Sequence, residues 1–312
     1  MNRIEKKELA PDAARLFEEE VLELIPDISR TELCAMVDDF IYYQTDRMSR
    51  EEARALVDRI CRRTADSTKG RSSRAAQMRG KGHAFTAEQG GQAMKIQKIG
   101  IIGSGHIGGN LGVMLAKAGY EVVLSSRHPD RLKDLVKEAG PKACTGTVAE
   151  AAAFGEVIVL SLPLKAIPEL DTGIQEALKG KIVIDTSNPY PERDGAIAEA
   201  ARRDPGGMGV VVARLLPASR IIRAFNTVYF EDLKRTTTGS GEKIGIPLAG
   251  DDQEGLEAAV ALVERIGLDP VVVGALTTAK QFDVGTAVYA TGASAREIRE
   301  KLNIKPAGRR AA

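Results

Sequence analysis

The sequence predicts an α/β protein with a doubly wound, mainly parallel sheet, preceded by a small all-helical segment. From residue 94 onward, short apolar runs alternate with helical patterns, which is typical of a mainly parallel sheet built from βαβ units. A glycine-rich segment joins the first of these runs to the first helical pattern. Upstream, residues 1–63 carry only helical spacing of apolar residues and two capping-box patterns.

Composition limits the possible classes of protein. The chain has 312 residues, of which 43% are hydrophobic, so it can form one large domain or two modest ones. Its net charge of +1 argues against nucleic-acid or membrane partners, and no apolar run is long enough to span a bilayer. The charged start of the chain does not lead into an apolar stretch, so we expect no signal peptide and a cytoplasmic protein. The three cysteines are far apart and predict neither disulfides nor a metal site.

The expected domain organisation has three parts. Residues 1–63 form a helical segment, with amphipathic helices expected over residues 17–25, 33–41 and 53–60. Residues 64–93 are rich in Gly, Ser, Lys and Arg, which is typical of a flexible linker; contact of its basic residues with nucleic acid is the less favoured alternative. Residues 94–312 form the α/β domain.

Strands and helices of this domain can be assigned in order. The fourth strand is apolar throughout, as expected of a strand buried on both faces of a parallel sheet. A helical pattern over residues 111–118 follows the first strand, and others cover residues 148–154, 253–266 and part of 167–178. The strands are expected over residues 98–102, 120–125, 142–145, 156–161, 181–185, 221–225, 243–250 and 270–273.

The glycine-rich segment at residues 103–108 has the spacing G-x-G-x-x-G between a strand and a helix. The first glycine permits a tight turn, the second lets a pyrophosphate approach the backbone, and the third lets helix and strand pack closely. Glycines also mark ordinary βα turns, but this setting favours a dinucleotide at the helix N-terminus. The predicted cofactor-binding residues here are Gly103, Ser104, Gly105, His106, Ile107 and Gly108.

The end of the second strand indicates which dinucleotide binds. Proteins that bind NAD usually place an acidic residue there against the ribose 2′-hydroxyl. This chain instead has Ser125, Ser126 and Arg127. The serine hydroxyls and the guanidinium can donate hydrogen bonds to a 2′-phosphate, so we predict NADP; the alternative is a solvated arginine.

Loops after the fourth, fifth and sixth strands supply the remaining candidates, because ligands bind beyond the carboxyl ends of such strands. Each loop alone is compatible with an ordinary turn, but together, behind a dinucleotide fingerprint, they favour a site. We predict an acceptor pocket of Leu162, Pro163, Asn188 and Asn226, with Ser161, Pro163 and Asn188 also contacting the cofactor.

No side chain is assigned a catalytic role. His106 could donate a proton, but a residue at this variable position more often only lines the pocket. The chain has three histidines, too few and too scattered for a multi-histidine metal site, and we predict no metal. A serine hydrolase is not expected, because no G-x-S-x-G motif occurs.

Several segments together resemble a known family. In addition to the glycine loop and Ser126–Arg127, they include an A-F-N-T element at residues 224–227 and an A-G-D-D element at residues 249–252. Residues 188–189, 222–223, 246–248, 190–195 and 282–289 extend the likeness. Over about residues 95–302 the chain resembles NADP oxidoreductases of the coenzyme F420-dependent type. Members that act on F420 typically have Asn where this chain has His106.

The resemblance implies a Rossmann fold, NADPH binding at Ser126 and Arg127, direct hydride transfer, and a homodimer. We therefore expect an NADPH-dependent oxidoreductase acting on F420, a flavin or a small carbonyl or imine compound. One alternative is an NADP(H) sensor that signals through the N-terminal helices. Another is that these helices form an interaction module that recruits the enzyme to a partner.

Overall fold

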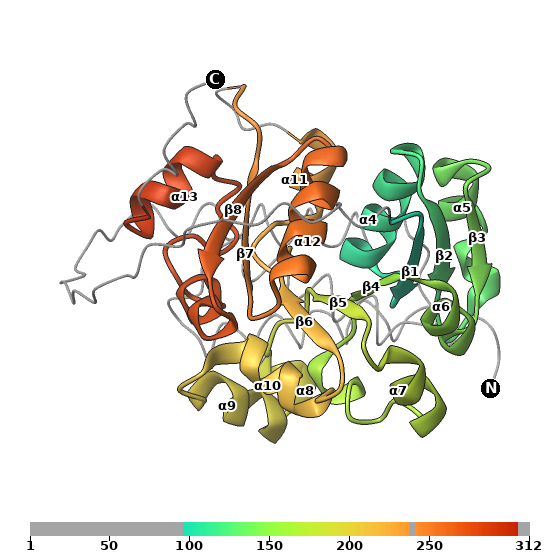
Figure 1. The fold of residues 1–312 in the computed structure, drawn as a ribbon, viewed down its shortest axis with the longest axis horizontal. Coiled ribbons are helices and arrows are strands. Elements are labelled where there is room, and N and C mark those ends of the chain that lie inside the picture. The colour runs from blue at the N-terminus through green and yellow to red at the C-terminus, as the bar shows by residue number, and fades with distance from the viewer. Residues whose placement is uncertain (1–95, 237–240, 305–312) are drawn as a thin grey trace, which may run out of the picture. The chain divides into compact units, whose positions relative to one another are not determined.

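The computed structural model describes residues 96–236 and 241–304 (Figure 1). The helices expected within residues 1–63 and the linker at residues 64–93 lie outside the described residues, so those assignments stay predictions. The described part contains no helix long and apolar enough to cross a membrane.

Within this part, one eight-stranded sheet has the order β3-β2-β1-β4-β5-β6-β7-β8 (Figure 1). Strands β1 to β6 are parallel, β7 is antiparallel to β6, and β8 is parallel to β7. The order reverses between β1 and β4, which is the Rossmann arrangement. The strands are β1 Lys98–Ile102, β2 Glu121–Ser125, β3 Ala143–Gly146, β4 Val157–Leu160, β5 Ile182–Asp185, β6 Arg220–Arg223, β7 Gly245–Gly250 and β8 Asp269–Gly274.

Helices cover both faces of the sheet because neighbouring residues of each strand point to opposite sides. Ile101 packs into a core cluster with residues of α4 and α12, whereas Ile102 packs into a second cluster with residues of α6, α7, α9 and α10. The α-helices are α4 His106–Lys117, α5 Lys133–Ala139, α6 Val148–Phe154, α7 Thr172–Leu178, α8 Pro191–Asp194, α9 Ala196–Arg203, α10 Gly207–Leu215, α11 Phe230–Arg235, α12 Gln253–Arg265 and α13 Ala295–Lys301. The described residues also form the 3₁₀ helices η1 Pro129–Leu132, η2 Leu164–Ala166 and η3 Leu276–Phe282.

The predicted α/β fold and all eight strands are confirmed, with shifts of one or two residues at several ends. The largest change is at β6, which ends at Arg223 although the apolar pattern continues to Phe225. Phe225 has φ +62, a left-handed backbone conformation that cannot continue a strand. Such a conformation in a bulky buried residue is a local strain, and here it turns the chain toward Asn226.

Candidate cofactor and acceptor site

The first and third glycines of the loop after β1 are required by the fold. Gly103 has φ +93, and a Cβ added to it would lie 2.2 Å from the Ser161 carbonyl oxygen. A Cβ on Gly108 would lie 2.0 Å from the Gly103 carbonyl oxygen. Gly105 differs, because its φ of −73° and ψ of −159° suit any residue. The backbone conformation at position 105 therefore does not itself require glycine, and close approach of a pyrophosphate is the role that the G-x-G-x-x-G spacing assigns to it.

The first turn of α4 is suited to an anion. This 12-residue helix begins at His106, has no acidic residue in its first turn and receives no hydrogen bond from a capping side chain. Its N-terminal amides and dipole therefore favour a phosphate group. The other residues of the loop bind it to the fold: Ser104 N donates to Ser125 O over 3.0 Å, and Ile107 packs against the core.

The aromatic ring of His106 packs on α11. Its centroid lies 4.5 Å from that of Phe230, which in turn lies 4.6 Å from Tyr229. Asn110, one turn further along α4, donates its side-chain amide to the Phe230 carbonyl over 3.1 Å. An aromatic group from α11 thus flanks the glycine loop.

The three residues after Leu124 differ in how accessible they are. Ser125 is buried, and its hydroxyl donates to the Ile101 carbonyl over 2.6 Å. This corrects the expectation that both serines offer hydroxyl donors, because that of Ser125 is already used inside the sheet. Ser126 is half-buried and accepts from His128 N over 3.1 Å. Arg127 is exposed and has no hydrogen-bond or ion-pair partner among the residues the structure describes.

The loops after β1, β4, β5 and β6 lie next to one another at the carboxyl edge of the sheet, because each continues the strand pairing by one residue. Ser161 N donates to Ile102 O over 2.8 Å, Thr186 N to Leu160 O over 3.0 Å, and Ala224 N to Asp185 O over 3.1 Å.

Leu162 and Pro163 lie at the glycine-loop end of this row. An added Cβ on Gly103 would meet Leu162 Cδ2 at 2.9 Å, and the buried Pro163 caps η2. These residues therefore form the side of the candidate site nearest the cofactor loop.

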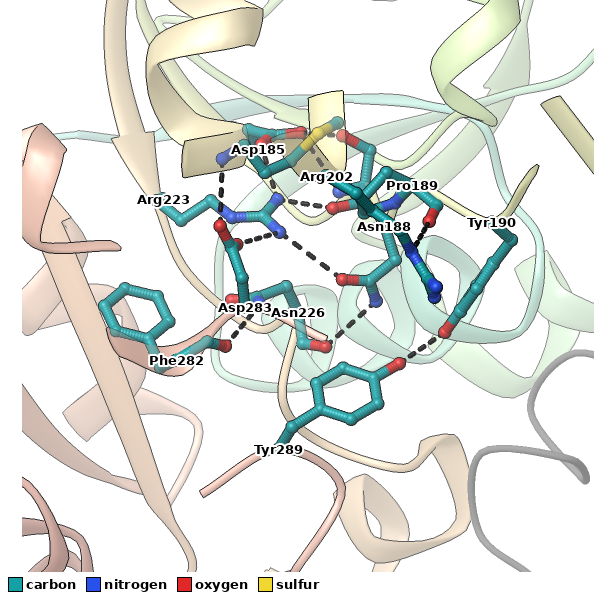
Figure 2. A network of polar contacts seen from close by, with 12 residues as sticks. Asp185, Asn188, Pro189, Tyr190, Arg202, Arg223, Asn226, Phe282, Asp283 and Tyr289 are labelled. Carbon is teal, nitrogen blue, oxygen red and sulfur yellow. Dashed lines mark hydrogen bonds and ion pairs between the residues drawn. The ribbon is translucent and has the colours of Figure 1, made fainter. Parts of the chain in front are cut away.

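Asn188 and Asn226 form the other side of the candidate site (Figure 2). Asn188 Nδ2 donates to the Asn226 carbonyl over 3.0 Å, and Asn226 Nδ2 donates to the Phe282 carbonyl over 3.0 Å. Asn188 is half-buried, whereas Asn226 is buried and its Oδ1 has no partner within residues 96–236 and 241–304. Only Asn188 therefore presents an amide that a ligand can reach.

A buried arginine beside these asparagines was missed by the sequence analysis. Arg223 Nη1 lies 2.6 Å from Asp185 Oδ2, and Nη2 lies 3.1 Å from Asp283 Oδ1 (Figure 2). The side chains of Arg223 and Asp185 are completely buried. Burial alone would lower the pKa of Arg223, but the two carboxylates raise it above the usual arginine value, so the cation persists. The sequence signal that could have revealed it is the position of Arg223, a charged residue inside the apolar run at residues 221–225.

A pair of tyrosines links the loop after β5 to the segment after η3. The buried hydroxyls of Tyr190 and Tyr289 hydrogen-bond to each other (Figure 2). The guanidinium of Arg193 lies 5.0 Å from the centre of the Tyr190 ring and donates to the Asn188 carbonyl over 2.7 Å. Arg193 thus binds the Asn188 backbone, whereas Arg223 binds the Asn188 side chain.

Comparison with known proteins identifies the family. Residues 98–189 match the family described as NADP oxidoreductase, coenzyme F420-dependent. The F420-dependent NADP reductase of Methanothermobacter marburgensis is 30% identical over 201 residues, which cover 60% of this chain and 87% of that enzyme. The chain belongs to the coenzyme F420-dependent NADP oxidoreductase family. It is an NADP-dependent oxidoreductase, as its sequence predicted.

Two further similarities are more limited. The rat metalloreductase STEAP3 is 25% identical over 186 residues, and the chain spans only 36% of its length. A crystal structure titled as a putative F420-dependent NADP reductase from Arthrobacter sp. FB24 superposes with a TM-score of 0.51 at 22% identity. The superposed residues cover 59% of this chain and 87% of the Arthrobacter protein, and the similarity supports the fold alone.

Proposed function

We propose that this enzyme transfers a hydride between NADP(H) and coenzyme F420. The observation that carries the proposal is the extent of the similarity to an F420-dependent NADP reductase. It spans 201 residues and 87% of that enzyme, whereas the family model matches only residues 98–189. The similarity therefore covers most of an enzyme named for this reaction.

The residues around the glycine loop fit NADP(H). The uncapped first turn of α4 suits the pyrophosphate, and Gly105 holds the position at which the G-x-G-x-x-G pattern brings that group to the backbone. Arg127 is exposed, without a described partner, and none of the three residues directly after β2 is a carboxylate that would repel a 2′-phosphate. When bound, NADPH supplies the hydride, and the protein supplies orientation and exclusion of water.

Replacing Arg127 tests how the 2′-phosphate is recognised. Arg127→Ala removes a charge-assisted contact worth about 1.5–3 kcal/mol, so NADPH should bind roughly ten-fold more weakly or worse, while NADH is barely affected. Fluorescence titration with both cofactors measures this. The matched control is Arg203→Ala, which also removes an exposed arginine, on helix α9, and it should change neither affinity. Equal losses for NADPH and NADH in Arg127→Ala would assign Arg127 to the fold.

The acceptor side favours direct hydride transfer. The four residues predicted for the acceptor pocket are two amides, a leucine and a proline, none of which exchanges protons near neutral pH. Reduction of a small carbonyl or imine compound calls for a positioned proton donor. A deazaflavin or flavin that accepts a hydride at a ring carbon or nitrogen fits this set of side chains better.

Screening acceptors tests the proposal. NADPH oxidation is followed with F420, free flavins, and small imine and carbonyl compounds, using the full chain. We expect F420 to be reduced fastest. Preferential reduction of an imine would overturn the acceptor assignment. Tight NADPH binding with no turnover on any acceptor would favour the sensor alternative.

Replacing Asn188 tests the proposed positioning of the reactants. Asn188→Ala should lower turnover by about ten- to a hundred-fold, because hydride transfer depends on close alignment, yet weaken NADPH binding by a smaller factor. Steady-state kinetics with F420 and cofactor titration give the two quantities. Turnover equal to that of the unmodified enzyme would exclude Asn188 from the site.

A further inference from the structure

We infer that Arg223 is a positioning residue, which fixes the amide of Asn188 so that its N–H donor faces the nicotinamide carboxamide. The inference rests on the proposed function, because it takes Asn188 as part of the site that binds NADP(H). Arg223 itself is completely buried and cannot touch a ligand, so it acts only through Asn188.

The guanidinium of Arg223 is held from several sides. Arg223 in β6 is the direct register partner of Asp185 in β5, and the two side chains meet at 2.6 Å. Asp283 binds the other terminal nitrogen over 3.1 Å and also accepts from Met208 N over 2.9 Å. Arg223 additionally donates to the Ser187 carbonyl. A planar group with so many fixed partners has one orientation.

That orientation determines which end of the Asn188 amide points where. A guanidinium can only donate hydrogen bonds, so the group 3.3 Å from Arg223 Nη2 must be the Asn188 oxygen, Oδ1. The amide nitrogen then points away, and one of its two hydrogens bonds the Asn226 carbonyl at 3.0 Å (Figure 2). The second hydrogen is left to donate from a half-buried side chain at the carboxyl edge of the sheet.

The ligand group that matches this donor is a carbonyl oxygen. The nicotinamide ring of NADP(H) carries one, in its carboxamide. Without Arg223, the Asn188 oxygen loses the donor that fixes it, and the amide is held only by its bond to the Asn226 carbonyl. The expected consequence is loss of nicotinamide orientation with little effect on the rest of the cofactor.

The test compares Arg223→Lys with Arg220→Lys in the full chain. Lysine keeps a positive charge beside Asp185 but has no planar fork to reach Asn188 as well. Arg220 lies at the other end of β6 and also pairs with two carboxylates, Asp252 at 2.5 Å and Glu254 at 2.7 Å. Each variant is titrated with NADPH and with 2′-phospho-ADP-ribose, the part of the cofactor that lacks nicotinamide, and its turnover with F420 is measured.

For Arg223→Lys we expect NADPH to bind about five-fold more weakly, 2′-phospho-ADP-ribose to bind as before, and turnover to fall by about ten-fold or more. Arg220→Lys should change none of these. In an Asn188→Ala background, Arg223→Lys should have no further effect on the ratio of the two affinities. The inference would be overturned if Arg223→Lys left the ratio of the NADPH and 2′-phospho-ADP-ribose affinities unchanged. It would also be overturned if the effects of Arg223→Lys and Asn188→Ala on that ratio were additive.

Two provisions keep the test decisive. If Arg223→Lys does not fold, Asp283→Asn removes one of the two charges that hold the guanidinium and leaves Asp185 paired. It should weaken NADPH about two-fold relative to 2′-phospho-ADP-ribose, and equal effects on the two ligands would contradict the inference. If F420 is not the acceptor, turnover is lost as a readout in the unmodified enzyme too. The comparison of NADPH with 2′-phospho-ADP-ribose then still decides the role of Arg223.

Discussion

Gly105→Val is expected to weaken NADPH binding by more than about a hundred-fold, roughly 2.8 kcal/mol, while the domain stays folded. The backbone of Gly105, at φ −73° and ψ −159°, lies in the extended region, so valine there imposes no left-handed backbone strain. The added side chain would occupy the space in which the pyrophosphate meets the backbone. Fluorescence titration measures the affinity, and thermal unfolding shows whether the fold is retained.

Two other glycine positions make the comparison informative. Gly173→Val is the matched control, because no heavy atom lies within 4 Å of an added Cβ there, and it should leave NADPH affinity unchanged. Gly108→Val should instead destabilise the fold, since its Cβ would lie 2.0 Å from a backbone oxygen. Retained NADPH affinity in Gly105→Val would remove this loop from the cofactor site.

Arg223→Met is expected to lower the free energy of unfolding by about 3–5 kcal/mol, because it leaves the completely buried Asp185 carboxylate without its cation. Denaturant unfolding followed by circular dichroism measures the change. Arg220→Met, which breaks a partly exposed pair on the same strand, should lower it by no more than about 1 kcal/mol.

A second substitution identifies the cause of that loss. Adding Asp185→Leu to Arg223→Met removes the unpaired carboxylate and should restore part of the stability. A double variant as unstable as the sum of its parts would mean that packing, and not the buried charge, accounts for the effect.

The sheet and the glycine loop were predictable because their signals are local. Apolar runs alternate with helical spacing, and the G-x-G-x-x-G spacing falls within one strand–turn–helix unit. The structure adds why Gly103 and Gly108 must be glycines, and both reasons agree with the roles expected for the first and third positions.

The missed features depend on contacts between residues distant in the chain. The partners Asp185, Arg223 and Asp283 lie 38 and 60 residues apart, and no local pattern joins them. Likewise, the use of the Ser125 hydroxyl inside the sheet depends on the pairing of β2 with β1. Helices α9 and α10, between β5 and β6, were not assigned in the sequence analysis, although they cover one face of the sheet.

The central claim is that this chain binds NADP(H) through the glycine loop and the residues after β2 in order to transfer a hydride. Its most direct test is a side-by-side titration of the full, unmodified chain with NADPH and NADH at one ionic strength. We predict that NADPH binds about ten-fold more tightly or better, because only NADPH carries the phosphate that Arg127 can bind. Equal affinities, or tighter binding of NADH, would contradict the account.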